Sequence, residues 1–240
     1  REQLSKLAEQ QPASTSTAEA SDAETTVENE TVVSASAMSA SGQPTAERYT
    51  AFQQKQLAKA TKLNDAGLLL KAKGDYEQAA PLYEEALEIY EQIMGPGHPN
   101  VGIMLSNLAQ LAKSRKNNDR ALILYTNALS IFKESLSQND PLIALTLSRM
   151  AIIYGNQGDY DKAEPLFKQA VSIYQNNPQP DYEKIVKELT NLAILYENQE
   201  RYDQAETYYK KALDLAKQLY GEGHPQVKEL NDILQEYTNP

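Results

Sequence analysis

The chain has 240 residues, a formal net charge of −10 and no cysteine. The lack of cysteine excludes a disulfide framework and a thiolate metal site, and an acidic balance without a run of Lys or Arg argues against nucleic acid or anionic lipid as the main partner. No apolar run approaches the roughly 18 residues that a membrane-spanning helix needs, so we expect no direct membrane insertion.

The first 45 residues form a region of their own. Residues 12–45 consist mainly of Ala, Ser, Thr and Glu and contain no aromatic residue. Such a stretch buries too little apolar surface to offset the entropy of ordering it, so 1–45 is predicted to be a disordered tail. The chain begins with Arg1 rather than Met, and we expect that a segment before it has been removed, with a signal peptide or a lipid anchor as one alternative for that segment. The predicted compartment is therefore either cytoplasmic or exported and membrane-tethered.

Helical patterns begin at residue 46. Residues 46–62 are rich in Ala, Gln and Lys and lack Pro, which favours an N-terminal helical extension. The pattern continues until Gly74-Asp75 breaks it. From Tyr76 to about Met94, apolar residues recur at intervals of three and four, as on one face of a helix. The Gly and Pro residues of 95–99 end that helix.

The same residue types return every 42 positions, four times between residues 63 and 225. A fixed period of this length indicates stacked helix–turn–helix units. Small residues would let the two helices of a unit approach closely, and large apolar residues would fill the space between units. Residues 226–240 are predicted to form a capping helix. The repeated positions are Tyr76, Ala79, Tyr83, Ala86 and Leu87; Asn118, Ala121, Tyr125, Ala128 and Leu129; Tyr160, Ala163, Phe167, Ala170 and Val171; and Tyr202, Ala205, Tyr209, Ala212 and Leu213.

These units resemble the tetratricopeptide repeat (TPR), which places small and large apolar residues at set positions of a helix pair. The period of 42 and the two Gly-x-Gly-His-Pro motifs that begin at Gly95 and Gly221 are similar to the repeats of kinesin light chains and their bacterial relatives. A kinesin-type heptad segment is not visible, so the chain resembles the bacterial type more closely. The second repeat departs from the pattern, because Lys116-Asn117-Asn118 replaces Gly-Asp-Tyr. A looser turn is expected there.

The resemblance implies an all-α fold: a right-handed superhelical solenoid of four TPR helix pairs plus a C-terminal capping helix. In TPR arrays the first helices line a concave groove, where Asn side chains can bond the backbone of an extended peptide. Carried over by register, the residues that would bind a peptide or partner are Asn64, Ser106, Asn107, Gln110, Lys113, Ser148, Arg149, Ile152, Asn156, Thr190, Asn191, Ile194 and Asn198.

The side chains that could carry chemistry have structural interpretations. His98 and His224 are three whole repeats apart, so they cannot converge on one metal ion, and each is predicted to cap a turn before a helix. Acidic pairs such as Glu84-Glu85 are predicted to be solvated. No Gly-rich phosphate loop or GxSxG elbow is present. We therefore expect no metal, cofactor or catalysis. Eight tyrosines are predicted to pack in the repeat core: Tyr76, Tyr83, Tyr125, Tyr154, Tyr160, Tyr196, Tyr202 and Tyr209.

The function predicted from these features is a non-catalytic protein–protein interaction scaffold that binds a peptide or partner segment in its concave groove. One alternative is a permanent structural or assembly subunit of a larger complex, either at a membrane or away from one. Another is a protein that assembles end to end through its repeats. An enzyme is the remaining alternative, for which the sequence offers no catalytic constellation.

Overall fold

The computed structural model describes residues 49–238, in which every regular element is an α-helix. The predicted tail, 1–45, lies outside this range. The chain divides into two compact units, whose described parts are residues 49–138 and 139–238.

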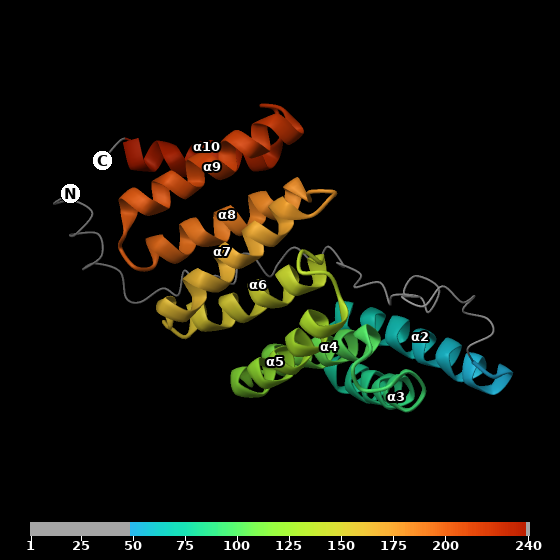
Figure 1. The fold of residues 1–240 in the computed structure, drawn as a ribbon. Helices are drawn as coiled ribbons and strands as arrows, with labels where there is room; N and C mark the ends of the chain where they lie inside the picture. The colour runs from blue at the N-terminus through green and yellow to red at the C-terminus, as the bar shows by residue number, and fades with distance from the viewer. Residues whose placement is uncertain (1–48, 239–240) are drawn as a thin grey trace. The chain divides into compact units, whose positions relative to one another are not determined.

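The 49–138 unit contains two helix pairs, coloured blue to green in Figure 1. Each helix packs on the next one in the chain. The predicted extension is not a separate element, because one unbroken helix includes it together with the first helix of repeat one. A capping box at Thr50 starts this helix, with Thr50 Oγ1 accepting from the Gln53 amide. The helices are α2 (Ala51–Ala72), α3 (Tyr76–Met94), α4 (Pro99–Ser114) and α5 (Asn118–Ser135).

The 139–238 unit contains two further pairs and a final helix, coloured yellow to red. Consecutive helices again pack on one another, and α10 lies against α9. The described residues thus form the expected four helix pairs followed by a single C-terminal helix. The helices are α6 (Pro141–Asn156), α7 (Tyr160–Asn176), α8 (Tyr182–Glu197), α9 (Tyr202–Tyr220) and α10 (Pro225–Thr238).

The turn inside each helix pair has one geometry, repeated four times. The second or third residue after the first helix has a positive φ, and the amide of the residue that follows it bonds back five residues, as from Asp159 N to Tyr154 O at 2.9 Å. These are the bonds of a Schellman motif, which ends a helix with a left-handed residue. The second repeat has this turn as well, so its turn is not looser. The left-handed residues are Gly74, Lys116, Gly158 and Glu200, spaced 42 apart.

Both histidines cap helices, as predicted. Nδ1 of His98 accepts a hydrogen bond from the Asn100 amide at 3.1 Å, and Nδ1 of His224 accepts one from the Gln226 amide at 3.3 Å. Each histidine precedes a proline at the first position of its helix, where the missing N–H costs nothing. The Gly-x-Gly-His-Pro motif is therefore a helix stop joined to a helix start.

The core follows the 42-residue register. The alanines four residues before the large core residues are fully buried in every repeat, as at Ala79 and Ala163. At Gly67 there is no room for a side chain, because a Cβ there would lie 2.6 Å from Cε1 of Tyr83. The predicted filling residues at 83, 125, 167 and 209 are all buried.

The tyrosine prediction is right for some residues and wrong for one. Tyr83, Tyr125, Tyr196 and Tyr209 are buried, while Tyr76, Tyr154 and Tyr160 are half-buried. Tyr202, the first residue of α9, is 54% exposed and does not pack in the core. Sequence reasoning also left two buried aromatic residues, Phe132 and Tyr174, out of the core. They take the register of Tyr90, which the apolar spacing of 76–94 includes and which is buried as well.

Candidate functional site

A row of polar side chains links the first helices of repeats one and two. We call it the α2–α4 polar chain; its members are Lys71, Gln110, Asn107 and Asn64. Lys71 Nζ donates to Gln110 Oε1 at 2.9 Å, and Gln110 Nε2 donates to Asn107 Oδ1 at 3.4 Å. Asn107 Nδ2 then donates to Asn64 Oδ1 at 2.9 Å. Two positions singled out by sequence, 64 and 107, are thus brought into direct contact.

The direction of this chain follows from its first member. An ammonium group can only donate, so Gln110 must turn its oxygen toward Lys71 and its amide nitrogen toward Asn107. Asn107 must in turn direct its oxygen toward Gln110 and its nitrogen toward Asn64, whose oxygen accepts the last hydrogen bond. The last donor, Asn64 Nδ2, finds no hydrogen-bond partner among the described residues. Leaving such a donor unpaired costs about 1–3 kcal/mol.

Burial separates the predicted residues of the 49–138 unit into two groups. Asn64 and Asn107 are 1% and 0% exposed, and Ser106 is buried as well. These three side chains are too buried to contact a peptide directly. They can affect peptide binding only by positioning their half-buried neighbours. Gln110 and Lys113 are half-buried and reach the surface. Lys71, one repeat before Lys113, is also half-buried and was not in the predicted set, although the register points to it.

In the 139–238 unit the predicted residues of α6 range from buried to exposed. Ser148 is 3% exposed, Arg149 and Ile152 are half-buried, and Asn156 is exposed near the end of the helix. This face is less polar than that of α4, because Ile152 takes the register of Gln110.

The predicted residues of α8 mostly bond within their own helix. Thr190 Oγ1 donates to Val186 O at 3.0 Å, and Asn198 is the C-cap residue, whose amide donates to Ile194 O. Ile194 itself is half-buried. Asn191 Nδ2 donates to Glu188 Oε2 at 3.2 Å.

Glu188 is a buried carboxylate that sequence reasoning missed. Its side chain is 3% exposed on a helix whose neighbouring residues are mostly apolar. The signal was present in the register, because the equivalent residues of the preceding repeats are Met104 and Thr146. An acidic residue at a position that other repeats fill with Met or Thr indicates a buried carboxylate held by hydrogen bonds.

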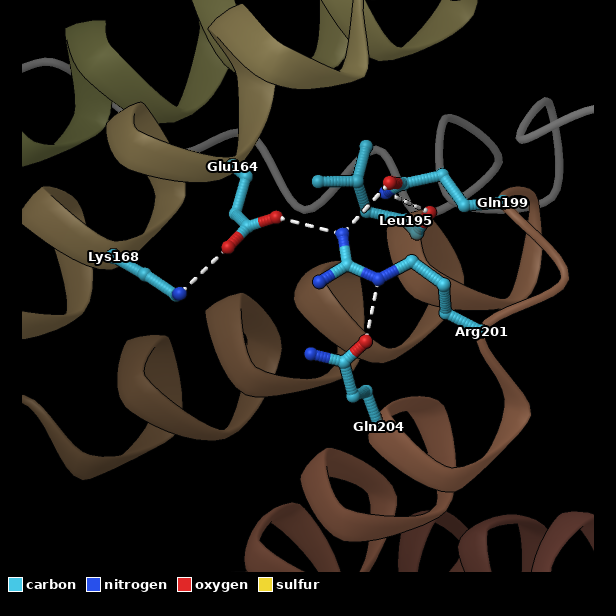
Figure 2. Close-up of polar contacts among 6 residues, drawn as sticks. All are labelled: Glu164, Lys168, Leu195, Gln199, Arg201 and Gln204. Atoms are coloured by element: carbon cyan, nitrogen blue, oxygen red, sulfur yellow. Dashed lines mark hydrogen bonds and ion pairs between the residues drawn. The ribbon is translucent and has the colours of Figure 1, made fainter.

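A second polar cluster lies at the turn between α8 and α9, and Figure 2 shows Arg201 at its centre. Arg201 Nη1 donates to Glu164 Oε2 at 3.1 Å and to Gln199 Oε1 at 2.9 Å, while Nε donates to Gln204. The guanidinium also lies over the Tyr196 ring, 4.5 Å from its centroid. Arg201 takes the helix-start register held by Asp75 and Asp159 in other repeats. It joins α7 to the fourth repeat.

The other oxygen of Glu164 holds Lys168. Lys168 Nζ lies 2.7 Å from Glu164 Oε1 and 6.0 Å from the Tyr196 ring centroid. Burial raises the pKa of Glu164, but the hydrogen bonds that it accepts from Lys168, Tyr196 and Arg201 outweigh burial and leave its pKa below the ordinary value. Glu164 is therefore a carboxylate that orients two cations.

Glu197 bonds two tyrosines on the last two helices; we call this arrangement the Glu197 clamp. Its two carboxylate oxygens accept from Tyr209 Oη and Tyr237 Oη, each at 3.0 Å. Burial raises the pKa of both phenols well above the ordinary value, and the Glu197 charge raises it further. The clamp connects α8 to α9 and α10.

Neither polar cluster has the composition of a metal centre. Among residues 49–238, no three His, Asp or Glu side chains gather closely enough to hold a metal ion. Within the same range, none of the helices has both the length and the apolar character that crossing a bilayer requires.

Comparison with known proteins decides the family. The sequence profile described as "Tetratricopeptide repeat" matches four overlapping segments, 58–134, 103–176, 142–218 and 185–230, which together include more than half of the chain. The chain belongs to the tetratricopeptide repeat family. No curated protein sequence matches it.

Solved structures show the same fold in kinesin-light-chain-like proteins. BtubC (BKLC) from P. vanneervenii is 24% identical, with a TM-score of 0.63 over 69% of this chain and 66% of its own. The match thus spans just under two thirds of BtubC. A candidate kinesin light chain of Podosopora anserina, with nearly identical TPR-like repeats, is 16% identical, with a TM-score of 0.64 over 74% of this chain and 84% of its own. The resemblance to a bacterial-type relative fits BtubC.

Repeats of this family generally mediate protein–protein interactions and are typically non-catalytic scaffolds. This general role agrees with the two polar clusters, which hold helices together and present hydrogen-bonding groups.

Proposed function

We propose that this TPR protein is a non-catalytic scaffold that binds an extended segment of a partner protein on the polar face of α2 and α4. The observation that carries the proposal is the directed α2–α4 polar chain. Its orientation is imposed by Lys71, and its half-buried members, Lys71 and Gln110, lie at the surface end. Buried amides behind them hold the side chains in place.

The chemistry of the face favours a ligand rich in acceptors. Gln110 Nε2 has two hydrogens and directs one to Asn107, so the second can reach a backbone carbonyl of the ligand. Lys71 and Lys113 add donors of positive charge on the same pair of helices. An extended peptide presents one backbone carbonyl per residue, so a peptide of any sequence could bond to this row of donors.

A displayed peptide library selected on the full chain tests this proposal. Peptides that bind should lose affinity by roughly 1–3 kcal/mol when Lys71→Met and Gln110→Ala are combined, because each half-buried hydrogen bond is of that order. Lys133→Met is the matched control, because Lys133 is exposed on α5 and its substitution removes the same positive charge as Lys71→Met. Circular dichroism melts should verify that all variants remain folded.

If the selected peptides bind the double variant and the control equally well, the α2–α4 face is not the binding surface. Loss of affinity in both variants would instead indicate attraction by overall charge.

A further inference from the structure

A groove of about 520 Å³ lies on the 139–238 unit, over three consecutive helices, α7, α8 and α9. Its floor is apolar and is formed by Val171, Ile185, Leu189 and Leu192, with Leu215 at one side. The polar side chains at its rim are Lys168, Gln175, Tyr208, Lys211, Asp214 and Gln218.

The groove does not belong to the face on which the predicted binding residues lie. On α8 its lining residues, Ile185, Leu189 and Leu192, are spaced by four and three and share one side of the helix. Asn191 is two residues beyond Leu189, about 200° around the helix at 3.6 residues per turn. The groove is therefore independent of the proposed peptide face.

The rim carries two ordered cations. Lys168 is fixed at the edge by Glu164, at 2.7 Å, and its side chain is still 47% exposed. Lys211 lies over the Tyr208 ring, 4.8 Å from the centroid. Tyr208 stacks in turn on Tyr196, with ring centroids 5.2 Å apart. Asp214 is the single acidic residue among the groove-lining side chains.

Comparison of the repeats shows that the positive charge of this rim is specific to the third and fourth repeats. Positions 84 residues earlier place Val101, Leu105 and Leu108 where the floor residues of α8 lie, so the floor belongs to the repeat itself. The rim is reversed in charge, because Lys168 corresponds to the exposed Glu84 and Gln175 to the exposed Glu91, while Lys211 corresponds to Asn127. Packing of the array explains the apolar floor but does not explain the two lysines.

We propose that the α7–α9 groove is a docking site for a short acidic amphipathic helix of a partner protein. The lining residues of α9 extend from 208 to 218, about 15 Å of helix, which matches roughly three turns of a ligand helix. Apolar side chains at i, i+4 and i+7 of the ligand lie on the floor, as in helix-in-groove recognition. Its carboxylates meet Lys168 and Lys211. The groove therefore favours an acidic ligand, although the net charge of the whole chain is −10.

Two synthetic helical peptides of about four turns test the proposal. Both have leucines at i, i+4 and i+7; one has Glu at the flanking positions and its twin has Lys. General attraction by a chain of charge −10 favours the basic twin, whereas the groove favours the acidic one. The location is read with a fluorophore on Gln175→Cys, a unique label because the chain has no other cysteine. The expected result is tighter binding of the acidic peptide and an emission shift at position 175, with no shift from the same label at Lys133→Cys on α5.

Charge variants complete the test. The pair Lys168→Gln and Lys211→Asn should weaken the acidic peptide by about threefold to tenfold. Lys211→Asn alone should give part of this loss without disturbing the Glu164 pair. The pair Lys133→Gln and Lys228→Asn removes the same charge from exposed lysines on α5 and α10 and should leave the affinity unchanged.

Three results would overturn the proposal: binding of neither peptide, equal binding of both, or an acidic preference that survives in the Lys168/Lys211 variant. None of these outcomes bears on Lys71 or Gln110, so the α2–α4 proposal stands or fails separately.

Discussion

At the scale of single residues, the turn inside each pair demands a left-handed backbone, and the four repeats supply it with different residues. Gly74 and Gly158 have φ of 78° and 80°, while Lys116 and Glu200 have 59° and 58°. A side chain with a Cβ pays a steric cost of about 1–2 kcal/mol in this region. The second and fourth repeats therefore keep the geometry at the expense of local strain.

We expect Glu200→Gly to stabilise the protein by about 0.5–1 kcal/mol, because relief of the steric cost exceeds the extra freedom that Gly has in the unfolded chain. The reciprocal change, Gly158→Glu, should destabilise it by a similar amount. Urea denaturation of the two variants measures both effects. A destabilised Glu200→Gly variant would mean that contacts of the Glu200 side chain outweigh the strain.

At the scale of helices, close approach depends on which small residue stands at the crossing. Ala109, Ala151 and Ala193 occupy the register of Gly67, so comparison of the repeats by sequence alone favours Gly67→Ala as a stabilising change. The structure reverses this expectation, since the added Cβ would lie 2.6 Å from the Tyr83 ring.

We therefore expect Gly67→Ala to lower the free energy of unfolding by about 1–3 kcal/mol through overpacking between α2 and α3. Thermal melts followed by circular dichroism measure the loss. In a Tyr83→Leu background, the same substitution should cost little, because the ring is gone. An equal cost in both backgrounds would place the strain elsewhere than in the Gly67–Tyr83 contact.

At the scale of the whole molecule, buried phenols make stability sensitive to alkaline pH. Burial, together with the neighbouring Glu164 carboxylate, raises the pKa of Tyr196 to about 12 from 10.0. Burial and Glu197 raise the pKa of Tyr209 and of Tyr237 as well. A group whose pKa is raised in the folded state contributes stability that is complete below the unfolded value and is lost as pH rises through the folded value.

We thus expect the free energy of unfolding to be constant with respect to these three tyrosines below about pH 10 and to fall as pH rises toward 12 and beyond. Helical circular dichroism and phenolate absorbance, followed together against pH, should change in the same range. Tyr182→Phe, on a half-exposed residue, should leave the transition in place. Phenolate formation by every tyrosine near pH 10 with the helices intact would contradict the expectation.

Much of the fold was predictable because its information is local and repeated. The 42-residue register located four helix pairs, the alanine and aromatic core positions and the last helix, since each repeat meets only its neighbours and the same contacts recur. The same register contained the buried residues Phe132 and Tyr174, one and two repeats after Tyr90, which sequence reasoning passed over because they lie outside the shorter common TPR pattern.

The sequence by itself thus determined the family, the helix pairs and the caps made by His98 and His224, because periodic spacing and turn chemistry act within a few residues. Only the tertiary structure decided which polar residues face inward. It buried Asn107, brought Lys71 to Gln110 across 39 positions, and set Lys168 and Lys211 on the rim of one groove. Helix periodicity assigns a residue to a face, but burial depends on how closely the next helix packs, and that distance is set by side chains far away in the chain.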